Sequence, residues 1–200
     1  MKSLITYIYE QLDQKIQKWL KDVYNNQQQL VKDNKVQPIE VDIEKLNKPE
    51  KEFLYDNYSN DPVFKKILAD KHLGFTVTNQ MFRIPKQYLI DNDKEYKPDC
   101  YPYWYQSDQN VYFVGLCLYD KNITYIENYI NLIGIESSLI VNNSGDLNKA
   151  ILNDFIKIIP KLGNYKGITI KPIHPKMKSI FIKLGFKTSS DNKEILVYKV

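Results

Sequence analysis

Apolar positions along the chain repeat with two periods, and each period predicts one kind of element. Apolar side chains recur every three or four positions in residues 1–31, which predicts one amphipathic helix. Residues 36–43 alternate apolar and charged side chains, which predicts a half-buried strand at an edge, where Pro38 is tolerated. Further apolar runs predict strands over 111–119, 133–141, 167–173 and 194–200. The pattern therefore divides the chain into an N-terminal amphipathic helix at 1–35 and a domain at 36–200.

Helix starts and stops are marked by proline, acidic residues and glycine. Helices are predicted from Lys48 to Tyr58, from Asp61-Pro62 onwards, over 149–162 and over 175–184 with Gly185 after it. Residues 85–109 are predicted to be irregular. They carry an aromatic cluster that is either a binding surface or a packed flap: Tyr101, Tyr103, Trp104 and Tyr105. This order of strands and helices predicts an α+β sandwich.

Composition narrows the class of protein. The chain has 200 residues, of which 43% are hydrophobic, so it can bury a proper core in one domain. Two cysteines, Cys100 and Cys117, make no disulfide scaffold, and no Cys/His cluster has metal-ligand spacing. We therefore expect a reducing compartment and no metal site. No apolar run is long enough for a membrane span or a signal peptide, so we expect a cytoplasmic protein without membrane contact.

The charge balance bears on nucleic-acid binding. The net charge is only +4, and Arg83 is the single arginine, which disfavours a nucleic-acid reader. A weaker alternative remains, in which lysines and the aromatic cluster at 101–105 bind a nucleic acid by stacking.

Residues 110–200 resemble a known family. A strand with Val114-Gly115-Leu116-Cys117-Leu118 precedes a second apolar strand, a polar loop and a helix. The strand at 168–173 follows, and the next helix ends in Phe181-Ile182-Lys183-Leu184-Gly185-Phe186. This order is similar to the acyl-CoA N-acyltransferases of the GNAT superfamily. The resemblance implies a mixed, mostly antiparallel sheet flanked by helices, acetyl-CoA as cofactor, and an amine as acceptor.

In that superfamily, a glycine-rich loop before a helix binds the CoA pyrophosphate with backbone N–H groups, since the helix N-terminus favours an anion. Here the resemblance places this loop near Val141, with a degenerate sequence that lacks most of the glycines. The residues implied in cofactor binding are Val141, Asn143, Ser144, Gly145, Asp146, Leu147, Asn148 and Lys149. Asp146 is better explained as an acid or N-cap at the start of a helix.

The catalytic groups also depart from the superfamily. Glu136 lies in the strand where the superfamily places a carboxylate facing the acceptor. It is the candidate catalytic base, or else a carboxylate that faces solvent. The tyrosine that can protonate the leaving thiolate is replaced by Phe181, which has no proton to give. His174 could substitute, but a surface histidine at a helix start is the simpler interpretation. Cys117 is expected to be a small buried side chain.

The first ten residues are similar to the short leader helices that target tailed-phage proteins to the capsid, with Met1-Lys2-Ser3 before an apolar stripe that ends in Glu10. This resemblance implies that residues 1–31 dock into a groove of a protein partner. It favours an alternative function: a catalytically inactive GNAT-like interaction protein, located in a virion. The enzyme hypothesis and this alternative both remain open at the level of the sequence.

Overall fold

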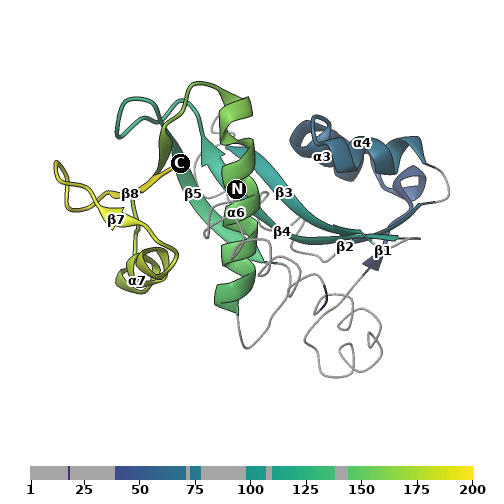
Figure 1. The fold of residues 1–200 in the computed structure, drawn as a ribbon. Coiled ribbons are helices and arrows are strands. Elements are labelled where there is room, and N and C mark those ends of the chain that lie inside the picture. The colour runs from purple at the N-terminus through teal and green to yellow at the C-terminus, as the bar shows by residue number, and fades with distance from the viewer. Residues whose placement is uncertain (1–17, 19–38, 71–72, 78–97, 107–109, 138–143) are drawn as a thin grey trace, which may run out of the picture.

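The structure is a computed structural model that describes residues 18, 39–70, 73–77, 98–106, 110–137 and 144–200 (Figure 1). Lys18 is helical and exposed. The rest of the expected helix at 1–31 lies outside the described residues, so the division at residue 35 stays a prediction.

One mixed sheet organises the described part of the chain. Its strands are β1 (Ile39–Glu40), β2 (Gly74–Val77), β3 (Asp99–Gln106), β4 (Asn110–Asp120), β5 (Tyr129–Ser137), β6 (Gly167–Ile170), β7 (Lys187–Thr188) and β8 (Leu196–Lys199). They lie in the order β1-β2-β4-β5-β6-β8-β7, and β3 pairs with β4 off this path. Only β2/β4 and β5/β6 are parallel pairs among the described strands. The expected α+β fold, a mixed and mostly antiparallel sheet flanked by helices, is therefore confirmed.

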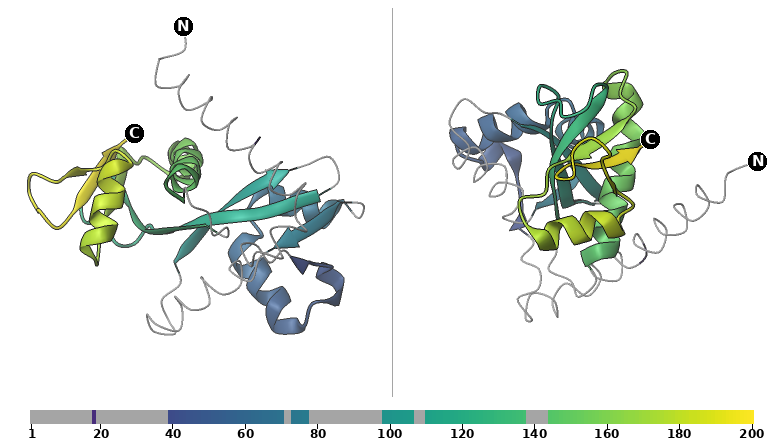
Figure 2. Two further views of the ribbon diagram at one scale, coloured as in Figure 1. Left: turned by 90° about the horizontal axis from the view of Figure 1, so that it is seen from below. Right: turned by 90° about the vertical axis from the view of Figure 1, so that its left-hand side faces the viewer.

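The helices lie on both faces of this sheet. The structure has a 3-10 turn η1 (Ile43–Lys45) and the helices α3 (Lys48–Tyr58), α4 (Pro62–Ala69), α6 (Ser144–Leu162) and α7 (Pro175–Lys183). Helices α3 and α4 cover one face, α6 covers the other, and α7 lies at the end of the sheet beside β7 and β8 (Figures 1 and 2).

The helix boundaries follow from local side-chain chemistry. Asn47 and Glu50 form a reciprocal capping box at the start of α3, and Asp61 accepts hydrogen bonds from the N–H groups of the first turn of α4. His174 caps α7 through Nδ1. Gly185 follows α7 with φ of 101°, a left-handed conformation that glycine adopts at little cost. The expected helices at 48–58 and 175–184 and the Asp61-Pro62 start are confirmed.

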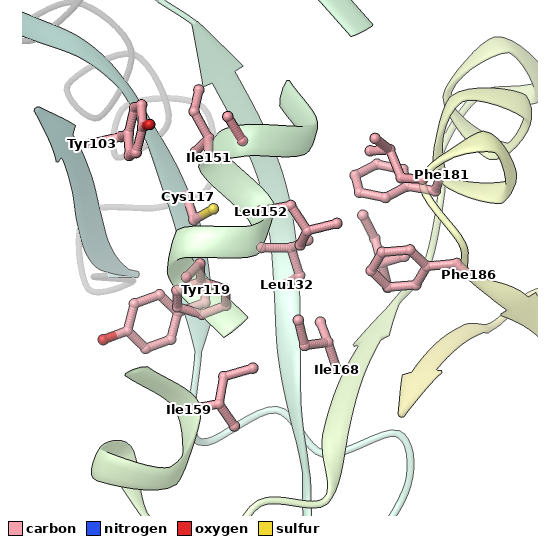
Figure 3. Close-up of a cluster of buried hydrophobic side chains, with 14 of the residues drawn as sticks. Tyr103, Cys117, Tyr119, Leu132, Ile151, Leu152, Ile159, Ile168, Phe181 and Phe186 are labelled. Carbon is pink, nitrogen blue, oxygen red and sulfur yellow. The ribbon is translucent and has the colours of Figure 1, made fainter. Parts of the chain in front are cut away.

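Strand β4 divides the core into two clusters, because its side chains alternate between the faces. Cys117 and Tyr119 pack with α6, β5 and the residues around α7, as Figure 3 shows. Leu116 and Leu118 pack with α3 and α4 on the opposite face. Both clusters depend on β4, so this strand ties the two helical layers together.

The aromatic segment was predicted as part of an irregular loop, and this is wrong. Residues 99–106 form β3, which pairs with β4 along almost its whole length. Tyr103, Trp104 and Tyr105 are buried, and Tyr101 is half-buried. Bases cannot stack on rings that are enclosed in the core, so the nucleic-acid alternative loses its stacking platform.

The bounds of five further elements differ from the expected ones. Helix α6 begins at Ser144 instead of 149, so residues 144–148 are helical and not a loop. Strand β5 (Tyr129–Ser137) begins before the expected 133, because its pairing with β4 starts at Asn131, which the apolar pattern did not include, and the expected residues 138–141 lie outside the described residues. The strands near 36–43, 167–173 and 194–200 are shorter than expected.

Candidate active site

Strands β5 and β6 part from one another, and this opening is the centre of the candidate site. They pair in parallel only from Tyr129 to Asn131, against Gly167–Thr169. Strand β6 ends at Ile170, whereas β5 continues to Ser137 along β4. Residues 132–136 of β5 therefore pair with no strand on the β6 side among the described residues.

A β-bulge lies where the two strands begin to part. Leu118 of β4 pairs with Gly134, but the next residue, Tyr119, pairs with Leu132, so Ile133 is an extra residue in β5. A bulge bends its strand and increases the local twist. The bulge therefore bends β5 just beyond its last pair with β6.

Helix α6 packs closely against the far end of β5 because Gly115 has no side chain. A Cβ atom on Gly115 would lie 2.4 Å from the carbonyl oxygen of Glu136 and 2.6 Å from Cδ1 of Ile151 in α6. Ser144 precedes Ile151 by about two helical turns, or about 10 Å. The first turn of α6, with N–H groups that have no partner within the helix, therefore begins near the end of β5.

The structure divides the predicted cofactor-binding residues into three groups. Val141 and Asn143 lie outside the described residues. Ser144, Gly145 and Asp146 form the first turn of α6, so of the two expected roles Asp146 is the acid at the helix start and not the N-cap. Leu147 is buried in the core. Asn148 and Lys149 are half-buried one turn further along. Cofactor binding by this segment stays a prediction.

Glu136 lies on the face of the sheet opposite α6. Its neighbour Ile135 packs against the cluster that contains α6, and its cross-strand partner Leu116 belongs to the cluster with α3 and α4. The side chain of Glu136 is exposed, yet the protein around it removes part of its water, which raises the pKa of the carboxyl group. A base on one face and a helix start on the other allow two reactants to approach the opening from opposite sides.

Two side-chain amides in this region have an unused acceptor. Asn131, at the last pair before β5 and β6 part, is 5% exposed, and Asn148 is on the second turn of α6. Within the described part of the chain, neither Oδ1 atom accepts a hydrogen bond, although both are buried. Buried polar atoms are normally satisfied, so each is an acceptor for a bound molecule or water. Acetyl-CoA carries amide N–H groups and a diphosphate, which fit these acceptors and the first-turn N–H groups of α6.

Three other residues have structural roles. His174 Nδ1 accepts a hydrogen bond from the Lys176 N–H at 3.2 Å on the surface, which confirms the surface interpretation of this histidine. Phe181 is 3% exposed and packs edge-on against Phe186, as expected of a core residue. Cys117 is fully buried, and burial raises the pKa of its thiol well above the ordinary value, so it is no thiolate nucleophile.

Two long-range polar contacts were not found by sequence reasoning. The Tyr101 hydroxyl donates a hydrogen bond of 2.8 Å to Asp154 and so ties β3 to α6. The Trp104 indole N–H donates to Asp61 at 3.0 Å and ties β3 to the start of α4. The partners are 53 and 43 residues apart, so no local pattern could have paired them.

Searches for metal clusters and membrane spans were negative for the described residues. No group of three or more His, Cys, Asp and Glu side chains there could hold a metal ion. None of the helices in that part of the chain is both long and apolar enough to cross a membrane.

No family model matches this chain, and no curated protein matches it. It is similar to solved structures of acetyltransferases and toxins. The KacTA–DNA complex has a TM-score of 0.42 at 15% identity, over 82% of this chain and 93% of that chain. AtaTR bound with acetyl-CoA has a TM-score of 0.41 at 9% identity, over 83% of this chain and 94% of that chain. The Campylobacter jejuni N-acetyltransferase PseH in complex with acetyl coenzyme A has a TM-score of 0.34 at 11% identity, over 82% of this chain and 99% of that chain. At these scores the similarity carries no argument about chemistry, which must come from the site itself.

Proposed function

We propose that this protein is an N-acetyltransferase that transfers an acetyl group from acetyl-CoA to an amine. The observation that carries the proposal is the parting of β5 and β6 after Asn131, beside the first turn of α6. An extended ligand can enter between two strands that part, because residues 132–136 of β5 pair with no strand on the β6 side within the described part of the chain. The resemblance of residues 110–200 to the GNAT superfamily agrees with this use of the opening.

Three parts of the chain would hold the cofactor. The first-turn N–H groups of α6 would bind the diphosphate, because the helix N-terminus carries partial positive charge. The Oδ1 atoms of Asn131 and Asn148 would accept hydrogen bonds from N–H groups of the bound molecule. The bound cofactor supplies a thioester, which is reactive towards amines.

Glu136 would receive the proton of the incoming amine, directly or through one water molecule. Its raised pKa makes it a stronger base than an ordinary glutamate, and its place across the sheet from α6 suits an acceptor that enters from the α3/α4 side. The remaining acceleration comes from holding the amine and thioester in the reacting geometry. The acceptor is an amine whose further structure this site does not define.

Calorimetric titration of the full chain with acetyl-CoA tests the proposal. We expect binding, and we expect Asn131→Leu to weaken it at least tenfold while the free protein becomes no less stable. The Oδ1 atom of Asn131 is buried and accepts no hydrogen bond within the described part of the chain, so its removal costs no hydrogen bond there. Thr169→Val is the matched control: Thr169 is fully buried at the same pair, but its hydroxyl donates to the Ile130 carbonyl. We expect this variant to bind acetyl-CoA normally.

Absence of binding at millimolar acetyl-CoA would reject the proposal. That result would favour the second function, a catalytically inactive interaction protein with a partner at residues 1–31, in a virion or another assembly. Catalysis itself is tested by thiol release from acetyl-CoA with a panel of primary amines. We expect Glu136→Gln to lower kcat/KM with the active amine by about 100-fold or more, without loss of acetyl-CoA binding.

A further inference from the structure

Charge is unevenly distributed along the chain. Residues 157–200 contain ten lysines but only two acidic residues, Asp191 and Glu194. This segment therefore has a net charge of +8, and the remaining 156 residues have −4, although the whole chain has only +4. Residues 39–70 contain eight acidic residues and five lysines, so the acidic excess includes the segment with η1, α3 and α4. The protein thus has a basic part and an acidic part.

The basic part also exposes apolar side chains. We call the segment with α7, β7 and β8 (residues 171–200) the basic lobe. Ile173 is 93% exposed, and Ile180 and Ile182 of α7 are 45% and 49% exposed. Lys176 and Lys183 lie about one turn on either side of Ile180, and both are exposed. The basic lobe therefore presents Ile180 between two lysines. Such a surface is complementary to one on which apolar residues are bordered by acidic residues.

A groove lined by both apolar and acidic residues lies in the other part of the molecule. It has a volume of about 900 Å³ and lies between η1, α4 and β2. Buried Ile67 and Phe75 line it together with Tyr55 and Leu68, which are 44% and 37% exposed. We call it the acidic groove, because Asp42, Glu44 and Asp70 also line it and Lys45 is the lining cation, paired with Asp42 at 2.9 Å.

We propose that the acidic groove binds the basic lobe of a second copy of this chain. Ile180 would enter the groove, and Lys176 and Lys183, which lie on the same face of α7, would face its carboxylates. The basic lobe and the acidic groove carry opposite charges, and each has apolar side chains that can pack against those of the other. The lobe has no arginine and no exposed aromatic ring, which favours a protein partner over a nucleic acid.

The positions of the two surfaces decide the kind of assembly. The basic lobe and the α3/α4 side lie at opposite ends of the sheet in Figure 1 and in the left view of Figure 2. A copy therefore cannot bring its own lobe to its own groove. Two copies arranged antiparallel satisfy both contacts at once, since each lobe faces the groove of the other copy.

Sedimentation velocity of the nuclease-treated full chain tests the proposal. At 50 mM NaCl we expect a concentration-dependent dimer, and at 1 M NaCl a monomer, because the screening length falls to about 3 Å. Two variants reverse the charges. The lobe variant carries Lys176→Glu with Lys183→Glu, and the groove variant carries Glu44→Lys with Asp70→Lys. We expect each variant alone to be monomeric at both salt concentrations.

The two variants together provide the decisive measurement. In an equimolar mixture, the reversed lobe of one faces the reversed groove of the other, and the unchanged lobe faces the unchanged groove. We therefore expect a heterodimer at 50 mM NaCl, although neither variant dimerises alone. Lys65→Glu with Lys66→Glu is the matched control, since it makes the same charge change at exposed positions of α4 that do not line the groove. We expect it to dimerise.

Three results would overturn the proposal: a monomeric wild-type chain at 50 mM NaCl, dimers in the single variants, or a mixture that stays monomeric. Self-association that appears only when a single-stranded oligonucleotide is added would also overturn it and would assign the lobe to nucleic acid. Circular dichroism shows whether the variants are folded. Acetyl-CoA titration is an independent measurement, because none of these residues lies at the candidate active site.

Discussion

Asp61 receives more hydrogen bonds than any simple helix cap requires. Its Oδ1 accepts the N–H groups of Val63 and Phe64, both at 2.9 Å, and the indole N–H of Trp104 at 3.0 Å. Burial raises the pKa of this carboxyl group, although the three hydrogen bonds oppose that change. The side chain thus starts α4 and also fixes the helix on β3.

We predict that Asp61→Ala lowers the free energy of unfolding by about 2 to 4 kcal/mol, from a lost cap and an indole N–H without an acceptor. Asp61→Asn keeps an acceptor oxygen, so its loss should be less than half as large. Urea denaturation followed by tryptophan fluorescence measures both. Equal losses for the two variants would show that the charge, and not the acceptor, is what matters.

For Glu136 we predict the opposite effect on stability, because its replacement should stabilise the protein at pH 7. Its pKa is higher in the folded protein than in the unfolded chain, because the folded protein removes water from the carboxylate. Between the two pKa values the folded state binds more protons, so its contribution to stability is present at low pH and is lost as the pH rises through the folded pKa. We expect Glu136→Gln to remove this dependence and to be slightly more stable than the wild type at pH 7. Thermal unfolding from pH 4 to 8 measures it, and a less stable variant at pH 7 would refute it.

At the scale of the elements, the contact between α6 and β4 depends on Gly115. We predict that Gly115→Ala destabilises the protein by about 1 to 3 kcal/mol and weakens acetyl-CoA binding, because the new methyl group would push α6 away from Glu136. Gly134→Ala is a matched control in β5, where a Cβ atom would have no neighbour within 4 Å. Chemical denaturation and calorimetry should separate the two variants. Similar effects in both would show that helix placement is not the cause.

The elements differ in how well the sequence predicts them. Helices α3, α4 and α7 begin at Asn47, Asp61 and His174, and local side-chain contacts with the first turn decide such starts. Strand β3 was missed because Pro102 lies within it, and a proline argues against a strand in the middle of a sheet. In the structure β3 pairs only with β4 among the described strands, so Pro102 costs no hydrogen bond on the other side.

The candidate site was predictable only in outline. The resemblance to the GNAT superfamily led to Glu136 and to the segment near α6. The unused oxygen of Asn131 depends on its pairing with Thr169 of β6, which is 38 residues later in the chain. The bulge at Ile133 likewise depends on the register between two strands. Neither feature has a local pattern, because each results from the way separate strands meet.

At the scale of the whole molecule, β4 joins both core clusters, and the two cysteines can report whether these clusters open together. Cys117 is fully buried, and burial raises the pKa of Cys100 to about 12. Neither residue forms a thiolate readily at pH 8. We predict that both react with a thiol reagent only through global unfolding, with the same dependence on urea. Cys100→Ser and Cys117→Ser assign the two reactions, and a Cys100 that reacts at much lower urea would show that the α3/α4 layer opens separately.

Because the bulge is a single extra residue in β5, the shape of the opening can be changed without changing the fold. Removing Ile133 would leave Leu132 opposite Tyr119 and Gly134 opposite Leu118, as they are now, so no side chain on either flank would change face. The shortened strand would follow a straighter course beside β6. We expect deletion of this one codon to give a folded protein with a narrowed entrance, against which the acyl-transfer activity of the full chain can be measured.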